Sequence, residues 1–295
     1  MLPNIVFNNF RCMIGQTKNG VQYGGDIILS SRYTKNIENI LNNKRNSLYC
    51  KDIFKTNKNI HHRIDKYNMN TIDIKMLKDY KKGYNVIWNN ICNNKFNINL
   101  GGDHSIAVST IQPLIDRYKN DLLVIWIDAH ADINTINSSL TKNKHGMPLS
   151  ALLGYMNHWY DKPSNLKKFN NLHKNNLIYV GIRDLDSYES KIIERNRIIN
   201  SKLLSESIIN TILCNPAKYI HISCDVDSLD PSIMPSTGTP VDGGLSMEDI
   251  MNIINCSKKK LIGLDIVEFN PMIGSKNDVK LTLSNINKII DHVIE

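Results

Sequence analysis

The chain has 295 residues, of which 41% are hydrophobic and 22% charged, and its formal net charge is +8. These proportions are typical of a globular protein with a large core and exclude an intrinsically disordered chain. Because the basic residues are scattered and form no aromatic-studded stripe, we expect no nucleic-acid partner.

No segment has the features of a targeting or membrane sequence. The N-terminus lacks the continuous apolar stretch of a signal peptide, and no apolar run approaches the roughly 18 residues of a membrane span. The six cysteines are widely spaced without a Cys-x-x-Cys pair, which favours reduced thiols over a disulfide framework. We therefore expect a soluble, cytoplasmic protein.

The first 92 residues predict strand, loop and helix in turn. Residues 4–15 alternate enough for one or two short strands, and Gly15–Gly25 is a glycine-rich loop. This loop lacks the strand–GxGxxG–helix order of a dinucleotide site, so it predicts a flexible connection. Ile27–Leu41 predicts a helix, and Asn57–His62 predicts a polar surface loop whose two histidines are solvated. Apolar residues at spacings of three and four predict an amphipathic helix over Thr71–Cys92.

From residue 96 onward, buried strands alternate with helices. The predicted strands are Phe96–Leu100, Leu122–Ile127, Leu177–Arg183, Lys218–Cys224 and Leu261–Val267. The predicted helices are Ile106–Lys119 (capped by Ser105 and kinked or split at Pro113), Leu149–Tyr155, Ile192–Asn196, Leu204–Leu213, Met247–Cys256 (opened by a Ser246–Asp249 capping box) and Asn277–Ile294. This alternation predicts one α/β domain over residues 1–295, with a doubly wound, mostly parallel β-sheet flanked by helices.

Three metal-binding side chains follow the most apolar of these strands. Asp128, His130 and Asp132 occupy alternate positions directly after Leu122–Ile127. Alternate residues of an extended chain point the same way, so the three can converge on one point. The carboxyl ends of strands are also where open α/β folds place their ligands. Alone, the motif also fits a solvated acidic turn.

The ends of three other predicted strands add further side chains of this kind. They are His104, the pair Asp225 and Asp227, and Glu268. Parallel strands share one carboxyl edge, so all these residues can meet. Two histidines and four aspartates are too many for one ion, and their oxygen-rich chemistry favours a hard metal such as Mn²⁺ over a structural zinc. Two cations about 3.5–4 Å apart, bridged by carboxylates, are the natural arrangement.

Other readings of the same residues stay open at this point. Asp227–Pro231 also fits a calcium-like acidic loop, and His145 could cap the helix that begins near Leu149. His221 lies inside a predicted strand, which favours a packed core histidine over a ligand.

Four motifs, in order, carry a resemblance to a known family. They are GGDHS (Gly101–Ser105), DAHAD (Asp128–Asp132), HGMP (His145–Pro148) and SCDVDSLDP (Ser223–Pro231). As a set they resemble the arginase family of ureohydrolases, which hydrolyse guanidino compounds to urea. The resemblance runs from about Gly101 to Pro271, and before Gly101 it is limited to the glycine-rich loop.

The resemblance implies two Mn²⁺ ions per subunit, a bridging hydroxide that attacks the guanidinium carbon, and L-arginine as substrate. The implied ligands of one ion are His104, Asp128, Asp132 and Asp225. The implied ligands of the other are Asp128, His130, Asp225 and Asp227. Asp132 would also relay a proton to the leaving amine, His145 would act as a shuttle, and Glu268 would hold the guanidinium group.

The family also implies contacts at the far end of the substrate. Asn134 and Thr141 would contact the α-carboxylate, and Asp186 the α-ammonium group, with Glu189 and Thr239 nearby. A site of this kind would release L-ornithine and urea. An agmatinase, or another ureohydrolase acting on a different guanidino compound, is the alternative. An inactive binding or scaffold protein would have lost a ligand or Glu268, and all are present.

The sequence departs from the family pattern in the substrate loop. Thr141 and Lys142 stand where arginases usually have Ser-Gly, and Ile136 stands where they usually have Pro. The resemblance also implies a homotrimer or homohexamer, held by helix faces and by Asp249, which occupies the position of an interfacial acid in the family. The C-terminal tail that clasps a neighbour in some members is not expected here.

Overall fold

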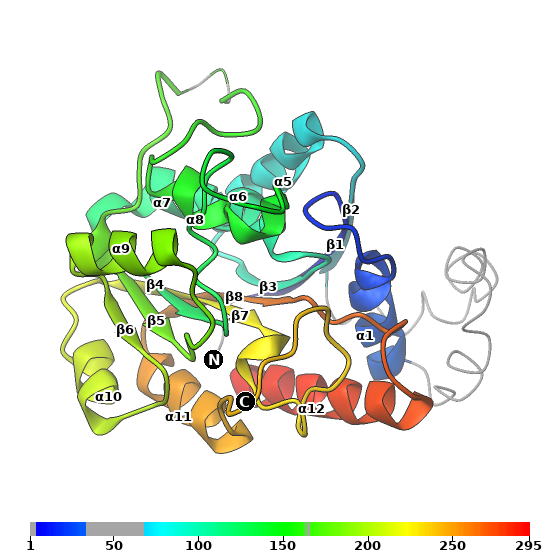
Figure 1. Cartoon of the computed structure of the whole chain (residues 1–295). Helices are drawn as coiled ribbons and strands as arrows, with labels where there is room; N and C mark the ends of the chain where they lie inside the picture. The colour runs from blue at the N-terminus through cyan, green and yellow to red at the C-terminus, as the bar shows by residue number, and fades with distance from the viewer. Residues whose placement is uncertain (1–3, 34–67, 163, 165) are drawn as a thin grey trace.

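All strands of the structure, a computed structural model that describes residues 4–33, 68–162, 164 and 166–295, pair in parallel. They form one eight-stranded sheet with the order β2-β1-β3-β8-β7-β4-β5-β6. Helices cover both faces of the sheet (Figure 1). The predicted fold class is therefore confirmed, with every described strand pair parallel.

The strands are β1 (Ile5–Cys12), β2 (Asn68–Ile74), β3 (Phe96–Leu100), β4 (Leu122–Ile127), β5 (Leu177–Val180), β6 (Ile199–Ser201), β7 (Tyr219–Asp225) and β8 (Leu261–Val267). Every residue of β3 and β4 is buried, because the sheet is covered on both faces there. The continuous apolar run of β4 is visible in the sequence, whereas β3 alternates apolar residues with Asn97 and Asn99. The three-residue strand β6 was not predicted, since its residues are largely exposed at the sheet edge.

The α-helices are α1 (Gly24–Tyr33), α5 (Tyr80–Cys92), α6 (Ala107–Thr110), α7 (Gln112–Tyr118), α8 (Pro148–Leu152), α9 (Ser187–Asn196), α10 (Glu206–Leu213), α11 (Met247–Ser257) and α12 (Lys276–Ile294). One core cluster joins the sheet to α1, α10, α11 and α12, and the other joins it to α5–α9. Leu123, Ile125 and Ile127 of β4 belong to the first cluster, and Leu122, Val124 and Trp126 to the second. The site is built on the central strands that separate these two clusters.

The single helix predicted over Thr71–Cys92 is wrong in its first part. Residues up to Ile74 belong to β2, which pairs in parallel with β1, and α5 begins only at Tyr80. Ile72 and Ile74 are buried while Thr71 and Asp73 are exposed, which is the two-residue period of a strand. That alternation was too short to stand out against the helical spacing that follows it.

Three further predictions concern how helices begin or divide. The expected Ser105 cap is wrong, because Asp103 is the capping residue and accepts the Ser105 N–H at 3.1 Å. The expected split at Pro113 is confirmed, since the helical segment divides at Ile111 into α6 and α7. The Ser246 capping box that opens α11 is confirmed as well.

Parts of two predictions lie outside the described residues. The predicted helix over Ile27–Leu41 is described only as far as Tyr33, and the loop over Asn57–His62 is not described.

His221 is confirmed as a core histidine with 1% exposure. In the described part of the chain, none of the helices combines the length and apolar character needed to cross a bilayer.

Candidate metal centre

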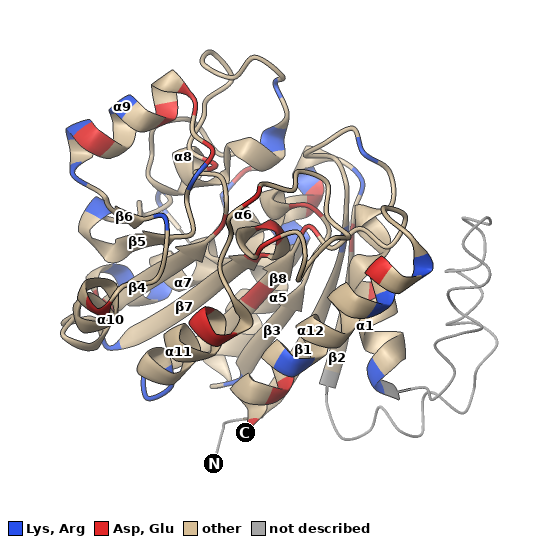
Figure 2. Ribbon diagram, turned by 60° about the horizontal axis from the view of Figure 1, so that its bottom comes forward, with Lys and Arg blue, Asp and Glu red and all other residues tan. Residues whose placement is uncertain are grey.

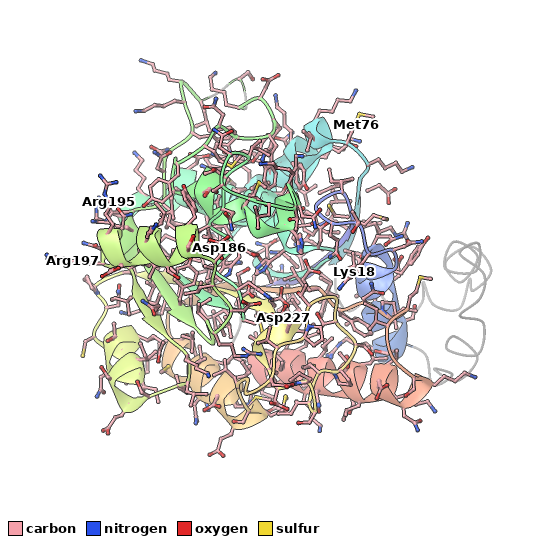
Figure 3. The ribbon with its side chains drawn as sticks, viewed as in Figure 1. Lys18, Met76, Asp186, Arg195, Arg197 and Asp227 are labelled. Carbon is pink, nitrogen blue, oxygen red and sulfur yellow. The ribbon has the colours of Figure 1, made fainter. Side chains whose placement is uncertain are left out.

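The four central strands end at one edge of the sheet and carry most of the candidate ligands there. β3, β8, β7 and β4 are consecutive neighbours, so their carboxyl ends lie side by side. Acidic residues gather on the loops that follow these strands (Figure 2). Asp186, Asp227 and Lys18 reach this region from three separate segments of the chain (Figure 3).

His104 points one ring nitrogen into a group of carboxylates. Its Nδ1 lies 2.9 Å from Asp128 Oδ2, 3.2 Å from Asp132 Oδ2 and 3.4 Å from Asp225 Oδ2. This nitrogen is buried, and no described residue forms a hydrogen bond with it. A buried polar atom without a partner is costly unless something completes its coordination. A cation between the imidazole and the three carboxylates would do so.

The imidazole ring of His104 is held in place by a hydrogen bond at Nε2 and by stacking on one of its faces. Its Nε2 lies 2.9 Å from Ser223 Oγ, and the ring stacks on Trp126 with centroids 3.9 Å apart and an interplanar angle of 8°. These contacts leave Nδ1 aimed at the carboxylates. The orientation suits a metal ligand, because outer contacts of this kind hold a ligand histidine in place.

His130 forms the second half of the cluster. Its Nδ1 lies 3.2 Å from Asp227 Oδ2 and 3.5 Å from Asp128 Oδ1. His104, Asp128 and Asp132 therefore form one group of converging ligand atoms, and Asp128, His130 and Asp227 form another. Asp128 belongs to both groups, as a bridging carboxylate would.

Asp225 has a position less symmetrical than the resemblance implies. Its Oδ2 faces His104, while its Oδ1 accepts the Asp227 N–H at 2.8 Å. The contacts of Asp225 thus tie the two halves together, although its carboxylate approaches the histidine of only one.

Two residues of the site have left-handed backbone conformations that are unusual for a residue other than glycine. Asp132 has φ +49° and Glu268 has φ +66°. Such conformations cost free energy and persist where the surroundings hold them. Here they turn both carboxylates towards the cluster.

Crowding of the carboxylates shifts their pKa values and those of the histidines. Burial lowers the pKa of His130, but hydrogen bonds to Asp128 and Asp227 outweigh this and raise it to about 12. Burial, followed by the charge of Asp128, raises the pKa of Asp132 to about 6. The cluster therefore attracts positive charge, which either protons or metal cations can supply.

The carboxylate of Glu268 contacts the candidate ligand His104 and two residues outside the ligand groups, Gln16 and His145. Its Oε1 accepts the His104 N–H at 2.8 Å and lies 3.2 Å from His145 Nδ1, while its Oε2 accepts the Gln16 amide at 2.5 Å. Burial lowers the pKa of His145, but the hydrogen bond and charge of Glu268 outweigh this and raise it to about 9. His145 also donates its backbone N–H to Gly15 at 3.1 Å.

The glycine-rich loop after β1 is part of the site, so its prediction as a merely flexible connection is wrong. The Gly15 N–H donates to Asp103 Oδ2 at 2.8 Å, and Lys18 Nζ donates to the Gly238 carbonyl. A Cβ on Gly15 would lie 2.7 Å from Asp103 Oδ1, so the close approach requires glycine. The sequence signal was a glycine run at a strand end, but only the sheet order places β1 beside β3.

The predicted contacts for the far end of the substrate are partly brought together. Asn134 Nδ2 donates to Asp186 Oδ2 at 2.8 Å, and Asp186 Oδ1 caps α9 by accepting the N–H groups of Tyr188 and Glu189. The Glu189 carboxylate accepts the backbone N–H groups of Ile133 and Asp186. Burial, followed by the charge of the nearby Asp132, raises the pKa of Glu189 to about 7.

The two threonines differ in position. Thr239 Oγ1 donates to Asp227 Oδ2 at 2.8 Å, so it lies against the cluster. Thr141 is exposed, and it forms hydrogen bonds with Ser139 and Asn143 of its own loop. The next residue, Lys142, has φ +61°, and its Nζ donates to the Ile136 carbonyl at 2.5 Å.

Comparison with known proteins decides the family. The sequence model of the arginase family matches residues 5–294. The chain belongs to the arginase family. Membership therefore extends well before Gly101, where the motifs alone gave little indication of it, and it supports a hydrolase that acts on guanidino compounds.

Individual members of the family confirm this. The chain is 34% identical to an arginase of Schizosaccharomyces pombe over 219 residues, which cover 70% of this chain and 67% of that protein. It is 38% identical to an arginase of Saccharomyces cerevisiae over 203 residues, which cover 64% and 61%. Among these relatives, then, the match spans roughly two thirds of the yeast proteins' length or slightly less.

Solved structures of the arginase fold match nearly the whole chain. The arginase of Bacillus subtilis aligns with a TM-score of 0.75 and 24% identity, over 99% of this chain and 98% of that one. The agmatine ureohydrolase of Thermoplasma volcanium aligns with a TM-score of 0.68 and 21% identity, over 99% and 89%. At these identities the structures support the shared fold and do not separate one substrate from another.

Proposed function

We propose that the protein is a manganese-dependent arginase, which hydrolyses L-arginine to L-ornithine and urea. The observation that carries this proposal is the pair of converging ligand groups that share Asp128. Family membership supports a guanidino substrate.

The residues present fit two hard divalent cations. His104, Asp128, Asp132 and Asp225 would hold one, and Asp128, His130, Asp225 and Asp227 the other. The partnerless, buried Nδ1 of His104 among three carboxylates supports this assignment. Imidazole and carboxylate donors without thiolates favour manganese over a structural zinc. When bound, such cations lower the pKa of water from about 15.7 to about 7 and so supply a nucleophile.

Glu268 is the proposed partner of the guanidinium group. Burial raises its pKa, but the hydrogen bond from His145 and the His104 N–H outweigh this, so the pKa is below its usual value. Glu268 is therefore a buried carboxylate that stays ionised. A guanidinium cation buried without such a partner would cost roughly 3–5 kcal/mol.

Asp132 and His145 are the proposed proton carriers. The pKa of Asp132, raised to about 6, allows its carboxylate to take up and release a proton near neutral pH. His145 lies on the other side of Glu268 with 20% of its side chain exposed. It can therefore exchange protons with solvent while it contacts the site.

Asn134 and Thr141 are proposed to recognise the α-carboxylate, and Asp186 and Glu189 the α-ammonium group, with Thr239 alongside. Asn134 and Asp186 are already joined by a hydrogen bond, and the cap on α9 fixes the Asp186 carboxylate. Groups held in place before binding lose less entropy when the substrate arrives. Agmatine, the main alternative substrate, lacks the α-carboxylate, and sites built for a polar group reject analogues without it.

Urea release decides between these substrates. We expect metal-free protein to be inactive, and added Mn²⁺ to restore urea release from L-arginine at a rate well above that from agmatine or guanidinobutyrate. Equal kcat/KM values for arginine and agmatine, or a preference for agmatine, would mean that the chemistry is right and the substrate wrong. No urea from any of the three would reject the proposal.

We further propose that the protein is a cytoplasmic homotrimer or homohexamer. The carboxylate of Asp249 accepts the backbone N–H and the hydroxyl of Ser246 at the start of α11. This cap is the only role that the described residues show for the proposed interfacial acid, so assembly rests on the family resemblance. Sedimentation at micromolar concentration tests it, and a monomer would rule it out.

A further inference from the structure

A buried polar path leads away from the cluster on the far side of His104. Ser223, on β7, places its Oγ 2.9 Å from His104 Nε2 and 3.4 Å from Oδ2 of Asp265, on β8. All three residues are fully buried, with 0% exposure. Asp265 is not one of the proposed ligands and does not contact the proposed substrate groups.

Asp265 is a carboxylate surrounded by donors. Its Oδ2 also accepts Thr110 Oγ1 at 2.6 Å, and its Oδ1 accepts Asn99 Nδ2 at 2.6 Å and lies 3.1 Å from His221 Nε2. Burial raises the pKa of Asp265, but His221 and the hydroxyl and amide donors outweigh this and hold it below its usual value. A fully buried charge is retained only where it is paired and hydrogen-bonded, as here.

The direction of the hydrogen bonds along this path is determined at its Asp265 end. An ionised carboxylate can only accept, so Ser223 donates its hydroxyl proton to Asp265 and offers a lone pair to His104. His104 must then carry a proton on Nε2, which leaves the lone pair of Nδ1 for a cation. An amide in place of the carboxylate could donate to Ser223 and reverse the order. The hydroxyl would then donate to Nε2 and place the proton of the neutral ring on Nδ1.

We propose that Asp265 is a positioning residue that acts through Ser223 to hold His104 in the tautomer that binds metal. This inference rests on the proposed role of His104 as a ligand. Asp265, which lies inside the sheet, should therefore affect the affinity of one metal site only, because His104 belongs to one of the two ligand groups. Among the described residues, the group of Asp128, His130 and Asp227 makes no hydrogen bond or ion pair with Ser223 or Asp265, and it meets the path only through the Asp128 that it shares with His104.

Metal binding to the full-length, metal-free protein tests the inference. Titration with Mn²⁺, followed by the electron paramagnetic resonance signal of the free ion, gives the affinity of each site without reference to activity. We expect Asp265→Asn to weaken one site by roughly 10–100-fold, the effect typical of outer contacts to a ligand histidine, and to leave the other unchanged. Equal weakening of both sites, or of neither, would overturn the proposal.

Thr110→Val is the matched control. It removes a donor to the same Oδ2 atom but supplies no group that could donate to Ser223. We therefore expect it to lower the free energy of unfolding while leaving both Mn²⁺ affinities unchanged. If it weakens the His104 site as much as Asp265→Asn does, the effect is a general one of core packing and the proposal fails.

A double-mutant cycle tests the route through Ser223. If Asp265 acts through this hydroxyl, Asp265→Asn in a Ser223→Ala background should cause no further loss at the His104 site, whereas independent effects would add. Should Asp265→Asn fail to fold, Ser223→Ala breaks the same path and must by itself weaken that site; unchanged affinity would refute the path.

The same measurements distinguish failure of the proposed arginase activity from failure of the proposed role of Asp265. Wild-type protein that binds two Mn²⁺ ions but releases no urea would reject the arginase activity and leave the role of Asp265 testable in the same titration. Wild-type protein that binds no Mn²⁺ would reject both.

Discussion

The candidate metal-ligand cluster and the proposed substrate loop (residues 134–144) lie close together but are held in different ways. The ligands stand at the ends of buried strands, and the ring of His104 is fixed by Trp126 and Ser223. The substrate loop is held largely by hydrogen bonds among its own residues, and Leu140 is 96% exposed. The proposed chemistry therefore lies on buried strand ends, and the proposed recognition of the far end of the substrate lies on a loop that can change with little effect on the fold.

The largest effect is expected from removing the shared carboxylate. Asp128→Ala should lower Mn²⁺ affinity at both sites by more than ~100-fold, beyond the range of outer contacts, and abolish urea release. His104→Ala should cost less, because His104 belongs to one group only. Metal content and kcat/KM would be measured for both variants. Full activity in Asp128→Ala, or a single tightly bound zinc in the wild type, would contradict the two-metal cluster.

His145 connects the two regions, and its stability contribution should depend on pH. Its pKa is raised to about 9 in the folded protein, above the ordinary value of 6.5. The contribution is therefore fully present below pH 6.5 and is lost as the pH rises through 9. In metal-free protein, His145→Asn should cost up to ~3 kcal/mol at pH 6 and little at pH 9.5. Urea denaturation at both values measures this, and a cost independent of pH would disprove the His145–Glu268 pairing.

Asp186 tests whether recognition is separate from metal binding. Asp186→Asn keeps a side chain that caps helices well but removes the charge proposed to meet the α-ammonium group. Loss of one charge-assisted hydrogen bond, worth ~1.5–3 kcal/mol, should lower kcat/KM for arginine by roughly 10-fold or more. Mn²⁺ affinity should not change. A matching fall in metal affinity would show that the two regions are not independent.

The smallest effect is expected from Lys142→Gly. The left-handed conformation of Lys142 is unfavourable for a residue with a Cβ, so glycine should raise the free energy of unfolding by up to ~1 kcal/mol. Lys144→Gly removes the same charge from the same loop at a position without a positive φ, and should not stabilise the protein. Thermal unfolding of the two variants gives the comparison, and equal melting temperatures would exclude backbone strain at Lys142.

Strand β4 was predictable because burial on both faces leaves a continuous apolar run. The candidate ligands were predictable because they stand at or shortly after the carboxyl ends of predicted strands and match motifs of the arginase family. β2 was missed because two alternating isoleucines precede a strong helical pattern. The roles of Gly15 and Gln16 were missed because their partners, Asp103 and Glu268, are far away in the sequence and adjacent only through the sheet order.

Asp265 could not have been singled out from the sequence either. It lies inside the apolar run of β8, and nothing near it in the chain shows that Ser223 and Thr110 face it from neighbouring elements. Side-chain partners across a sheet depend on register, and register is a property of the assembled strands.

We expect the left-handed backbone at Asp132 and Glu268 to affect how long the protein survives in a cell. These conformations, and the carboxylates packed around Asp128, cost folding free energy that bound cations would return, since a ligand of the folded state stabilises it by mass action. The metal-free chain should therefore unfold more often and be degraded faster. We expect its abundance to follow the supply of the metal, so that a cell short of the proposed manganese would lose the protein as well as the proposed activity.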